Sequence, residues 1–372
     1  MPADHILTYV ESLRGGGVER AQLRLAGGWL AAGRRVTLVA NRLEGPLCAE
    51  LPAGIETVTP RPRAVTSLLC LPTIVRQRKP DLIFCAGNTY TSIAAWTRAR
   101  LGPAMPPIVG KVSNSLRRRD LGPLGDWGNS AWLACHGRFL DHLVAMTPET
   151  ARRAERALRM RGRVEVIPNP PAETIPGAIG TALPRGRIVL GVGRLVAQKR
   201  WDRLIAALPL LADREVSLVI VGEGDRRTAL EAQVAALGLG SRVFLPGHAA
   251  DPLPVMARAA VVVLPSDFEG VPGVLREALS VGTPVIATES SPSVAEIVTS
   301  PTLGSIVAPD DPAALVAALD HWLGGATPRP APVPQPGYDS AARYLALFDR
   351  LVVTPSRRPS RPAARTVAPM QP

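Results

Sequence analysis

Short apolar runs alternate with helix-like segments throughout the second half of the chain, and this alternation limits the possible folds more than any other feature. The runs are rich in β-branched residues, and most of them end in Gly or Pro. They lie at residues 187–193, 216–222, 242–247, 260–266, 284–288 and 304–309. Strands that are apolar along their whole length are typical of a parallel sheet covered by helices on both faces. The pattern therefore predicts a doubly wound α/β domain over residues 187–335.

The first half repeats the pattern less regularly, and residues 1–170 are expected to form another doubly wound α/β domain. Its candidate strands lie at residues 5–10, 35–41, 81–86, 107–112, 143–147 and 164–169. A run rich in Pro, Gly and small residues predicts a linker over 171–186. We expect an amphipathic helix within 336–352, and a disordered basic tail over the Arg- and Pro-rich residues 353–372.

Composition excludes several classes of protein. Of the 372 residues, 46% are hydrophobic and 20% are charged, which excludes disorder for the body of the chain. No apolar run reaches the ~18 residues that span a bilayer, and residues 1–10 lack the pattern of a signal peptide. The four cysteines lie far apart without CxxC spacing, which argues against a disulfide framework or a zinc site. We therefore expect a soluble protein of a reducing compartment.

The net charge of +12 is unevenly distributed. Residues 1–180 carry a net charge of +10, residues 181–350 carry −2, and residues 351–372 carry +4. This asymmetry suggests an anionic partner for the first half, such as nucleic acid, a membrane surface or an acidic substrate. Since only three of the basic residues are lysines, an arginine excess set by the base composition of the genome is the alternative.

In open α/β sheets, ligands bind beyond the carboxyl ends of the strands, so the loops that follow strands are the places to look for a site. One such loop follows the strand that ends at Gly193, and it carries Arg194 and Lys199. Two fixed cations at a strand end can clamp a diphosphate. A solvated basic loop is the alternative.

A second loop, within residues 266–288, combines carboxylates with glycines. Glu269 lies in the loop itself, Gly270 lets a ligand approach the backbone, and a helix is expected to begin near Gly273. The amides at this helix start can face an anion. Glu277 could accept hydrogen bonds from the two vicinal hydroxyls of a ribose, or it could simply favour the helix dipole.

Two further glycine-rich turns follow strands. Residues 15–17 are three glycines that open a helix, and they could approach a phosphate. They match neither the dinucleotide-binding fingerprint nor the P-loop, so a plain tight turn is the alternative. The turn at 222–224 is interpreted as a connection between a strand and a helix.

Taken together, these motifs resemble those of the retaining nucleotide-sugar glycosyltransferases of family 4, which have the GT-B fold. The similar segments are GGGVER near the start, GVGRLVAQKRWDRLI, VGEGDRR and FEGVPGVLREALSVGTPVIAT. The resemblance covers about residues 1–352. It implies an α/β protein with two facing Rossmann-like domains, in which the last helix crosses back to pack on the first domain.

The resemblance also implies a role for each matching residue. Arg194 and Lys199 would neutralise the donor diphosphate and the charge that grows on it as the sugar leaves. Glu269 would bind hydroxyls of the donor sugar, and Glu277 would bind the ribose. The other implied donor-binding positions are Gly16, Gly17, Gly193, Gly270, Val271, Pro272, Gly273, Val274 and Leu275 near the phosphates, with Val243 and Leu245 near the base.

No metal or other cofactor is implied, because the two cations and the helix start would replace it. The sequence contains no DxD triplet. The implied reaction retains the configuration of the anomeric carbon, and the leaving phosphate itself helps to deprotonate the acceptor.

One position departs from the family. Many members carry a His after the strand at 81–86, where this chain has Cys85–Asn88 instead. Asn88 can hydrogen-bond to a sugar hydroxyl but cannot act as a general base. We take Asn88, Lys111 and His248 as the candidate contacts to the acceptor or to a sugar.

The leading hypothesis is the transfer of a hexose or N-acetylhexosamine from a UDP- or GDP-sugar. The acceptor would be a glycan or a polyprenyl-diphosphate-linked glycan of surface polysaccharide synthesis. Basic runs at 117–119 and 152–163 suggest that the first domain contacts an anionic membrane, so we expect a cytoplasmic protein that can lie on the inner face of the cell membrane.

Two alternatives come from other functional classes. One is a protein of the same build that binds nucleic acid or a membrane, although the chain has only 4% aromatic residues and no basic motif interleaved with aromatics. We therefore expect no nucleic-acid partner. The other alternative is a nucleotide-sugar epimerase or hydrolase of the same fold.

Overall fold

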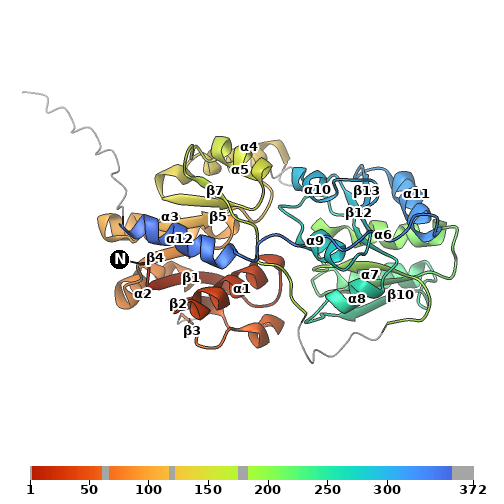
Figure 1. Cartoon of the computed structure of the whole chain (residues 1–372), viewed down its shortest axis with the longest axis horizontal. Helices are drawn as coiled ribbons and strands as arrows, with labels where there is room; N and C mark the ends of the chain where they lie inside the picture. The colour runs from red at the N-terminus through yellow and green to blue at the C-terminus, as the bar shows by residue number, and fades with distance from the viewer. Residues whose placement is uncertain (1, 61–66, 117–121, 175–182, 354–372) are drawn as a thin grey trace, which may run out of the picture.

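Two α/β units lie side by side in the computed structural model (Figure 1). The structure describes residues 2–60, 67–116, 122–174 and 183–353. The central part of the predicted linker, most of the predicted tail and the arginines at 117–119 lie outside these ranges. Within the described part of the chain, no helix is both long and apolar enough to cross a membrane.

The first unit is built on a parallel sheet of seven strands in the order β3-β2-β1-β4-β5-β6-β7. The strands are β1 (His5–Ser12), β2 (Arg35–Arg42), β3 (Glu56–Val58), β4 (Leu82–Cys85), β5 (Ile108–Lys111), β6 (His142–Ala145) and β7 (Val164–Val166). Six of them overlap the predicted runs. The edge strand β3 was not predicted, because its sequence ETV is short and two of its three residues are exposed.

The second unit is built on a parallel sheet of six strands in the order β10-β9-β8-β11-β12-β13. The strands are β8 (Ile188–Val192), β9 (Ser217–Val221), β10 (Val243–Gly247), β11 (Val261–Leu264), β12 (Val285–Thr288) and β13 (Gly304–Val307). Each lies inside a predicted run. The predicted fold class, two doubly wound parallel sheets, is confirmed.

Helices cover both faces of the first sheet, which explains why its strands are apolar throughout. Helices α2, α3, α4 and α5 pack on one face, and α1 packs on the other. Their bounds are α1 (Gly17–Ala31), α2 (Leu71–Arg78), α3 (Thr91–Leu101), α4 (Gly122–Leu133) and α5 (Pro148–Ala157). The connection from β1 to α1 leaves the start of α1 at the carboxyl end of the sheet.

The second sheet is covered in the same way, with α6, α7 and α11 on one face and α8, α9 and α10 on the other. Their bounds are α6 (Trp201–Ala207), α7 (Arg227–Ala236), α8 (Leu253–Arg258), α9 (Gly273–Ser280), α10 (Pro292–Ile297) and α11 (Pro312–Leu323). Helix α9 begins at Gly273, the residue at which the sequence predicts a helix start.

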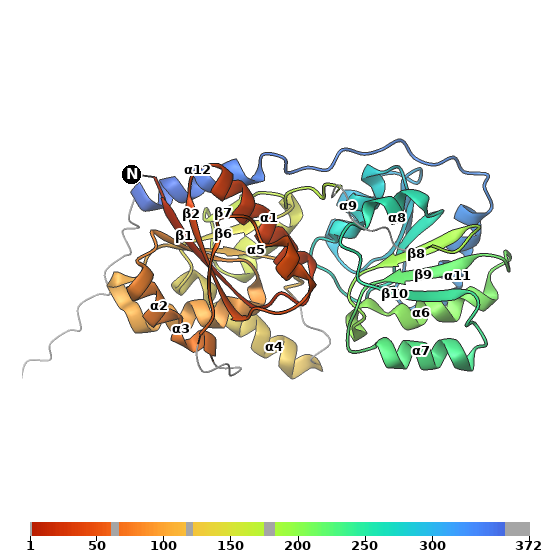
Figure 2. The same cartoon turned by 90° about the horizontal axis from the view of Figure 1, so that it is seen from below.

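The last helix, α12 (Ser340–Val353), lies on the first unit although the chain reaches it from the second (Figure 2). Tyr344 and Phe348 of α12 pack edge to face against Trp29 of α1, with ring centroids 6.0 and 5.2 Å away. Aromatic pairs at such separations add about 0.5–1.5 kcal/mol beyond the area they bury. Helix α12 thus completes one face of the first unit and ties the end of the chain to its start.

Candidate functional site

A cavity of about 470 Å³ lies between the two units, and the carboxyl ends of strands from both sheets point toward it. Its walls come from the loops after β1, β4 and β5 in the first unit and after β8, β9, β10 and β11 in the second. In each parallel sheet these loops emerge at the carboxyl ends of the strands, and the carboxyl ends of both sheets face the cavity. Residues that are far apart in the sequence therefore meet here.

Lys199 and Glu269 form an ion pair in this cavity, with 2.6 Å between Nζ and Oε1. The two side chains are only 15% and 10% exposed. The loops that carry them are fastened together by two hydrogen bonds, from Gln198 Nε2 to the carbonyl of Phe268 (2.6 Å) and from the Asp267 amide to the carbonyl of Gln198 (2.9 Å). The pair is therefore fixed by backbone contacts around it, and a lysine has two more N–H donors to offer a ligand.

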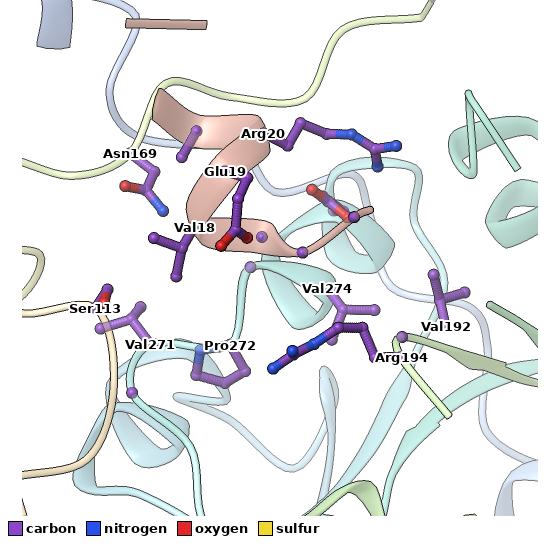
Figure 3. A pocket seen from close by; sticks show the side chains of 18 of the residues that line it. Val18, Glu19, Arg20, Ser113, Asn169, Val192, Arg194, Val271, Pro272 and Val274 are labelled. Carbon is purple, nitrogen blue, oxygen red and sulfur yellow. The ribbon is translucent and has the colours of Figure 1, made fainter. Parts of the chain in front are cut away.

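Arg194 points into the same space from the loop after β8 (Figure 3). Its carbonyl accepts a hydrogen bond from Trp201 Nε1 (2.9 Å), which holds the loop while leaving the exposed guanidinium on the cavity side. A side chain could not fit at Gly222 of the neighbouring loop, since its Cβ would lie 1.9 Å from the Gly193 carbonyl oxygen. The two loops thus need glycine to pack closely enough to form this wall.

The start of α9 is the third cationic feature of the cavity. No described side chain caps it, and its first residues carry no carboxylate, so its first N–H groups remain available to an anion. The residues before and in the first turn line the cavity: Gly270, Val271, Pro272, Gly273 and Val274. Leu275 does not line it, because its side chain is buried in the core between α9 and the sheet.

Glu277 lies one turn into α9 and also lines the cavity. Burial raises the pKa of its carboxyl, and the nearby guanidinium groups of Arg24 and Arg20 oppose that rise. The two arginines come from α1 of the first unit. Glu277 is therefore held in an electrostatic environment made by both units.

Helix α1 faces α9 across the cavity, and it too begins without a side-chain cap (Figure 3). Gly16 precedes it with a φ of 154°, and a Cβ there would lie 2.3 Å from Glu19 Oε2. The backbone angle favours glycine at this position, and a larger residue would also require the Glu19 carboxylate to move. Gly16 and Gly17 both line the cavity.

Arg20 of α1 bridges the two units. It forms a bidentate ion pair with Glu50, in which Nε and Nη2 donate to the two carboxylate oxygens (3.0 and 2.8 Å). Its Nη2 also lies 3.3 Å from Nε2 of His248 in the second unit. Burial lowers the pKa of His248, and the charge of Arg20 lowers it further. The neutral ring can accept a hydrogen bond from Arg20, so this contact is formed by the deprotonated histidine.

Besides Leu275, three of the predicted site residues are not at the cavity. Val243 is buried and Leu245 packs against the core, whereas the wall beyond β10 is made by His248, Ala249 and Pro252. Asn88 is used within the first unit, where its Oδ1 accepts hydrogen bonds from the amides of residues 113 (3.3 Å) and 114 (3.0 Å). Asn88 therefore holds a loop that lines the cavity instead of lining it itself.

Several lining residues escaped the sequence-based search. Those with polar side chains are Arg14, Glu19, Arg20, Arg24, Tyr90, Ser113, Asn114 and Asn169 in the first unit, and Gln198, Glu223, Arg276 and Gln335 in the rest of the chain. Glu19 follows the glycines at the start of α1 and could have been found by its place in the first turn. The others give no signal along the chain, because their position depends on how the two units face each other.

Among the residues that the structure describes, no three His, Cys, Asp or Glu side chains are placed to hold a metal ion. In the second unit, the charged residues predicted from the sequence form a cationic side and two carboxylates. Lys199, Arg194 and the start of α9 form the cationic side, next to Glu269 and Glu277. Such an arrangement can bind a molecule that carries both an anionic group and hydroxyls.

Two family models match the chain, one in each unit. The model described as Glycosyltransferase Family 4 matches residues 15–170, and the model described as Glycosyl transferases group 1 matches residues 186–324. The chain belongs to the family 4, group 1 glycosyltransferases. The family that the sequence motifs resemble is thus confirmed.

Curated relatives match parts of this chain. The lipopolysaccharide core biosynthesis glycosyltransferase LpsE of Rhizobium meliloti is 28% identical over 225 residues, which are 58% of this chain and 58% of LpsE. The uncharacterized glycosyltransferase MJ1607 of Methanocaldococcus jannaschii is 36% identical over 140 residues, 37% of this chain and 36% of the relative. The alignments thus span 58% and 36% of the length of these two relatives.

Solved structures match the chain over nearly its whole length. Anabaena Alr3699/HepE, in complex with UDP and glucose, superimposes with a TM-score of 0.71 at 21% identity, covering 94% of this chain and 98% of that one. At this identity the likeness shows a shared fold.

Proposed function

We propose that the protein transfers a sugar from a nucleotide sugar to a hydroxyl group of an acceptor glycan. The observation that carries the proposal is the buried pair of Lys199 and Glu269 beside Arg194 and the uncapped start of α9, all in one cavity. Family membership gives the reaction class, and these residues give it a chemical basis.

The cationic side of the cavity suits the diphosphate of the donor. When the bond between the sugar and the diphosphate breaks, a negative charge grows on the phosphate oxygen that leaves. Lys199, Arg194 and the helix amides would stabilise that charge more in the transition state than in the bound donor, which is how such groups accelerate a reaction. No metal is required by this scheme, since the three cationic groups supply the positive charge.

The two carboxylates suit the hydroxyl groups of the donor. Glu269 is anchored by Lys199 through one oxygen, which leaves the other to accept a hydrogen bond from the donor sugar. Glu277 lies on the first turns of α9, behind the amides that would hold the phosphates. That placement suits the ribose, whose two vicinal hydroxyls can donate to one carboxylate.

We propose that the transfer retains the anomeric configuration. The acceptor oxygen forms its bond to the anomeric carbon on the face from which the phosphate oxygen departs, and the acceptor proton passes to that phosphate oxygen. The bond formed and the bond broken share one face, so the diphosphate must stay beside the acceptor throughout. Lys199 and Arg194 would keep it there.

The donor is proposed to be a UDP- or GDP-linked hexose or N-acetylhexosamine, and the acceptor a glycan or lipid-linked glycan of surface polysaccharide synthesis. Two likenesses support this choice. LpsE is named for lipopolysaccharide core biosynthesis, and the similar Anabaena structure contains UDP and glucose.

A lipid-linked acceptor would bring the protein to the inner face of the cell membrane. The first half of the chain is strongly basic, and helix α4 exposes the side chains of Leu124 (86%) and Trp127 (73%). A basic surface with exposed tryptophan and leucine is typical of proteins that bind anionic membranes peripherally. We propose that the face carrying α3 and α4 contacts the membrane.

A thermal-shift series with UDP, GDP and their sugars tests the donor site, because a ligand that binds only the native state raises Tm. We expect one nucleotide and its sugars to raise Tm. Lys199→Ala and Glu269→Ala should remain folded but should abolish transfer.

Each competing function gives a different result. A hydrolase or epimerase would turn over the donor at full rate without any acceptor. A nucleic-acid-binding protein would bind polynucleotides in a salt-dependent manner and show no nucleotide-sugar effect. Full transfer activity in Lys199→Ala or Glu269→Ala would contradict the assigned site.

A further inference from the structure

The first unit places a buried ammonium group at the cavity, and none of the described residues forms a hydrogen bond with it. Lys111 is the last residue of β5, it is 1% exposed, and it lines the cavity. Its Nζ makes no hydrogen bond to any of the described residues. Burial lowers the pKa of Lys111 to about 8, and the charge of Glu19 opposes the shift. A buried charge without a hydrogen-bond partner destabilises the native state, so a ligand that pairs with it would bind favourably.

Glu19 supplies the complementary group on the same side of the cavity. It projects from the first turn of α1 into the cavity (Figure 3). Its Oε1 accepts one long hydrogen bond, from the hydroxyl of Tyr90 (3.4 Å). Burial raises the pKa of Glu19, and the charges of Arg194 and Lys111 oppose that shift. The carboxylate is thus largely withdrawn from water and incompletely paired.

The chemistry of these two groups selects the ligand. A lysine ammonium only donates hydrogen bonds, and a carboxylate only accepts them. Since Nζ of Lys111 forms no hydrogen bond with Glu19, a group that both accepts and donates can satisfy both. A phosphate or carboxylate would be repelled by Glu19, and a cation would be repelled by Lys111. A hydroxyl group fits both requirements.

We infer that Glu19 and Lys111 form a subsite that positions a hydroxyl group of the sugar acceptor, an inference that rests on the function proposed above. The donor residues Lys199, Glu269 and Glu277 belong to the second unit, so this subsite faces them from the first. Arg194, the cation proposed to hold the diphosphate, lines the same cavity as Glu19 and Lys111 (Figure 3). A hydroxyl held there lies on the side of the cavity from which it can reach the donor.

The subsite also accounts for a departure in the sequence. The loop after β4 carries Asn88 where many family members have a histidine, and Asn88 is occupied by the loop at 113–114. Positioning of the acceptor then has to come from other side chains. Glu19 and Lys111 are positioning residues in this scheme, because the leaving phosphate accepts the proton.

The test uses the full chain and four probes: the methyl α-glycosides of glucose, galactose, mannose and N-acetylglucosamine. Binding is measured by saturation-transfer NMR, with and without the nucleotide that raises Tm most. We expect the wild type to bind at least one glycoside, and Lys111→Met and Glu19→Gln to bind it at least tenfold more weakly. The shift in Tm caused by the nucleotide should be the same in both variants as in the wild type.

Stability provides a second readout that a purely structural lysine would not give. Lys111→Met removes a buried charge that has no hydrogen-bond partner among the described residues and keeps the length of the side chain, so Tm should rise by about 2–4 °C. Lys79→Met is the matched control, since Lys79 is exposed at the end of α2. It should change neither Tm nor the binding of glycosides.

The inference is overturned if the wild type binds none of the four glycosides, if both variants bind them as the wild type does, or if Lys111→Met lowers Tm. Failure of the proposed function gives a different result. In that case no nucleotide raises Tm and no donor is turned over, whatever the glycosides do.

Discussion

At the scale of single residues, the candidate site depends on charges that are held in place by their neighbours. Lys199 is fixed by Glu269, and Glu277 is held between arginines of the other unit. Such preorganised groups are effective because they need not reorient when charge develops on a ligand. Changing one charge while keeping the shape of its side chain is therefore the sharpest test.

Glu269→Gln keeps the volume of the side chain and removes the charge that orients Lys199. We expect kcat/KM for the release of nucleoside diphosphate to fall by about 10²-fold, since one displaced stabilising group has an effect of that order. Tm should change little. Glu289→Gln, at an exposed position outside the cavity, is the control and should leave the rate unchanged. A rate for Glu269→Gln equal to that of the control would show that the ion pair is not needed.

His136 gives a residue-scale prediction about pH. It is fully buried, its ring nitrogens lie 2.9 Å from Thr91 Oγ1 and 3.0 Å from the Trp132 carbonyl oxygen, and burial lowers its pKa. Because the unfolded chain titrates near its usual value of about 6.5, acidification through that pH adds protons to the unfolded state first and destabilises the fold. The stability that neutral His136 provides is complete above this pH and is lost below it.

The measurement is the difference in Tm between wild type and His136→Gln at several pH values. Glutamine cannot be protonated, so it lacks this pH dependence. We expect the Tm of the wild type to exceed that of the variant most at pH 8, and this difference in Tm to be smaller at pH 5.5. A gap that stays constant or widens on acidification would contradict the argument.

At the scale of elements, strands were easier to predict than the helices and loops between them. All strands of the second sheet fall in predicted runs, because a strand buried on both faces must be apolar throughout. Edge strand β3 and helices α2, α3, α4 and α5 were not predicted. The strand is largely exposed, and the helices mix apolar residues with polar or small ones. The apolar sequence pattern is therefore weaker in elements that are not buried on both faces.

The loop before α9 leads to a prediction about contact between the units. A Cβ at Gly270 would lie 2.5 Å from the Ser113 carbonyl oxygen and 2.9 Å from the Asn114 Cα, and these backbone atoms cannot move aside cheaply. Gly270→Ala should therefore push the start of α9 away from the first unit. Overpacking typically costs about 1–3 kcal/mol, which would weaken nucleotide binding about tenfold or more.

Isothermal titration of the nucleotide into Gly270→Ala checks this expectation. The matched control is Gly240→Ala, where the added Cβ meets no atom within 4 Å. The control should bind as the wild type does, and both proteins should keep the circular dichroism of the wild type. Equal affinity in the two variants would mean that the close contact at Gly270 does not position α9.

At the scale of the whole molecule, the two units contribute different parts of the candidate site, and this is where sequence alone fell short. The cationic loop and the two carboxylates of the second unit could be predicted, since each follows a strand within a recognisable motif. Arg24 and Tyr90 could not be assigned to the site, because their distance from it depends on how one unit faces the other. Spacing along a chain carries no information on that orientation.

The exposed face of the first unit gives the last prediction. Leu124 and Trp127 of α4 are 86% and 73% exposed, and Trp96 of α3 is 38% exposed. The guanidinium carbon of Arg100 lies 5.2 Å from the centre of the Trp96 ring. Apolar side chains that project from a basic surface insert into the headgroup region of an anionic bilayer, while the basic groups attract it. We therefore expect the protein to sediment with vesicles containing 30% phosphatidylglycerol and to be released by high salt.

The double variant Leu124→Ser, Trp127→Ser separates insertion from charge attraction. Burying such side chains contributes about 1.5–3 kcal/mol each, so the partition coefficient should fall at least tenfold. Leu210→Ser is the control, because Leu210 is 62% exposed but lies in the second unit, and it should sediment as the wild type does. If the double variant sediments like the control, α4 does not face the membrane. If the wild type fails to sediment at low salt, the proposed membrane role is wrong. The positive charge of the first unit would then act on the acceptor only.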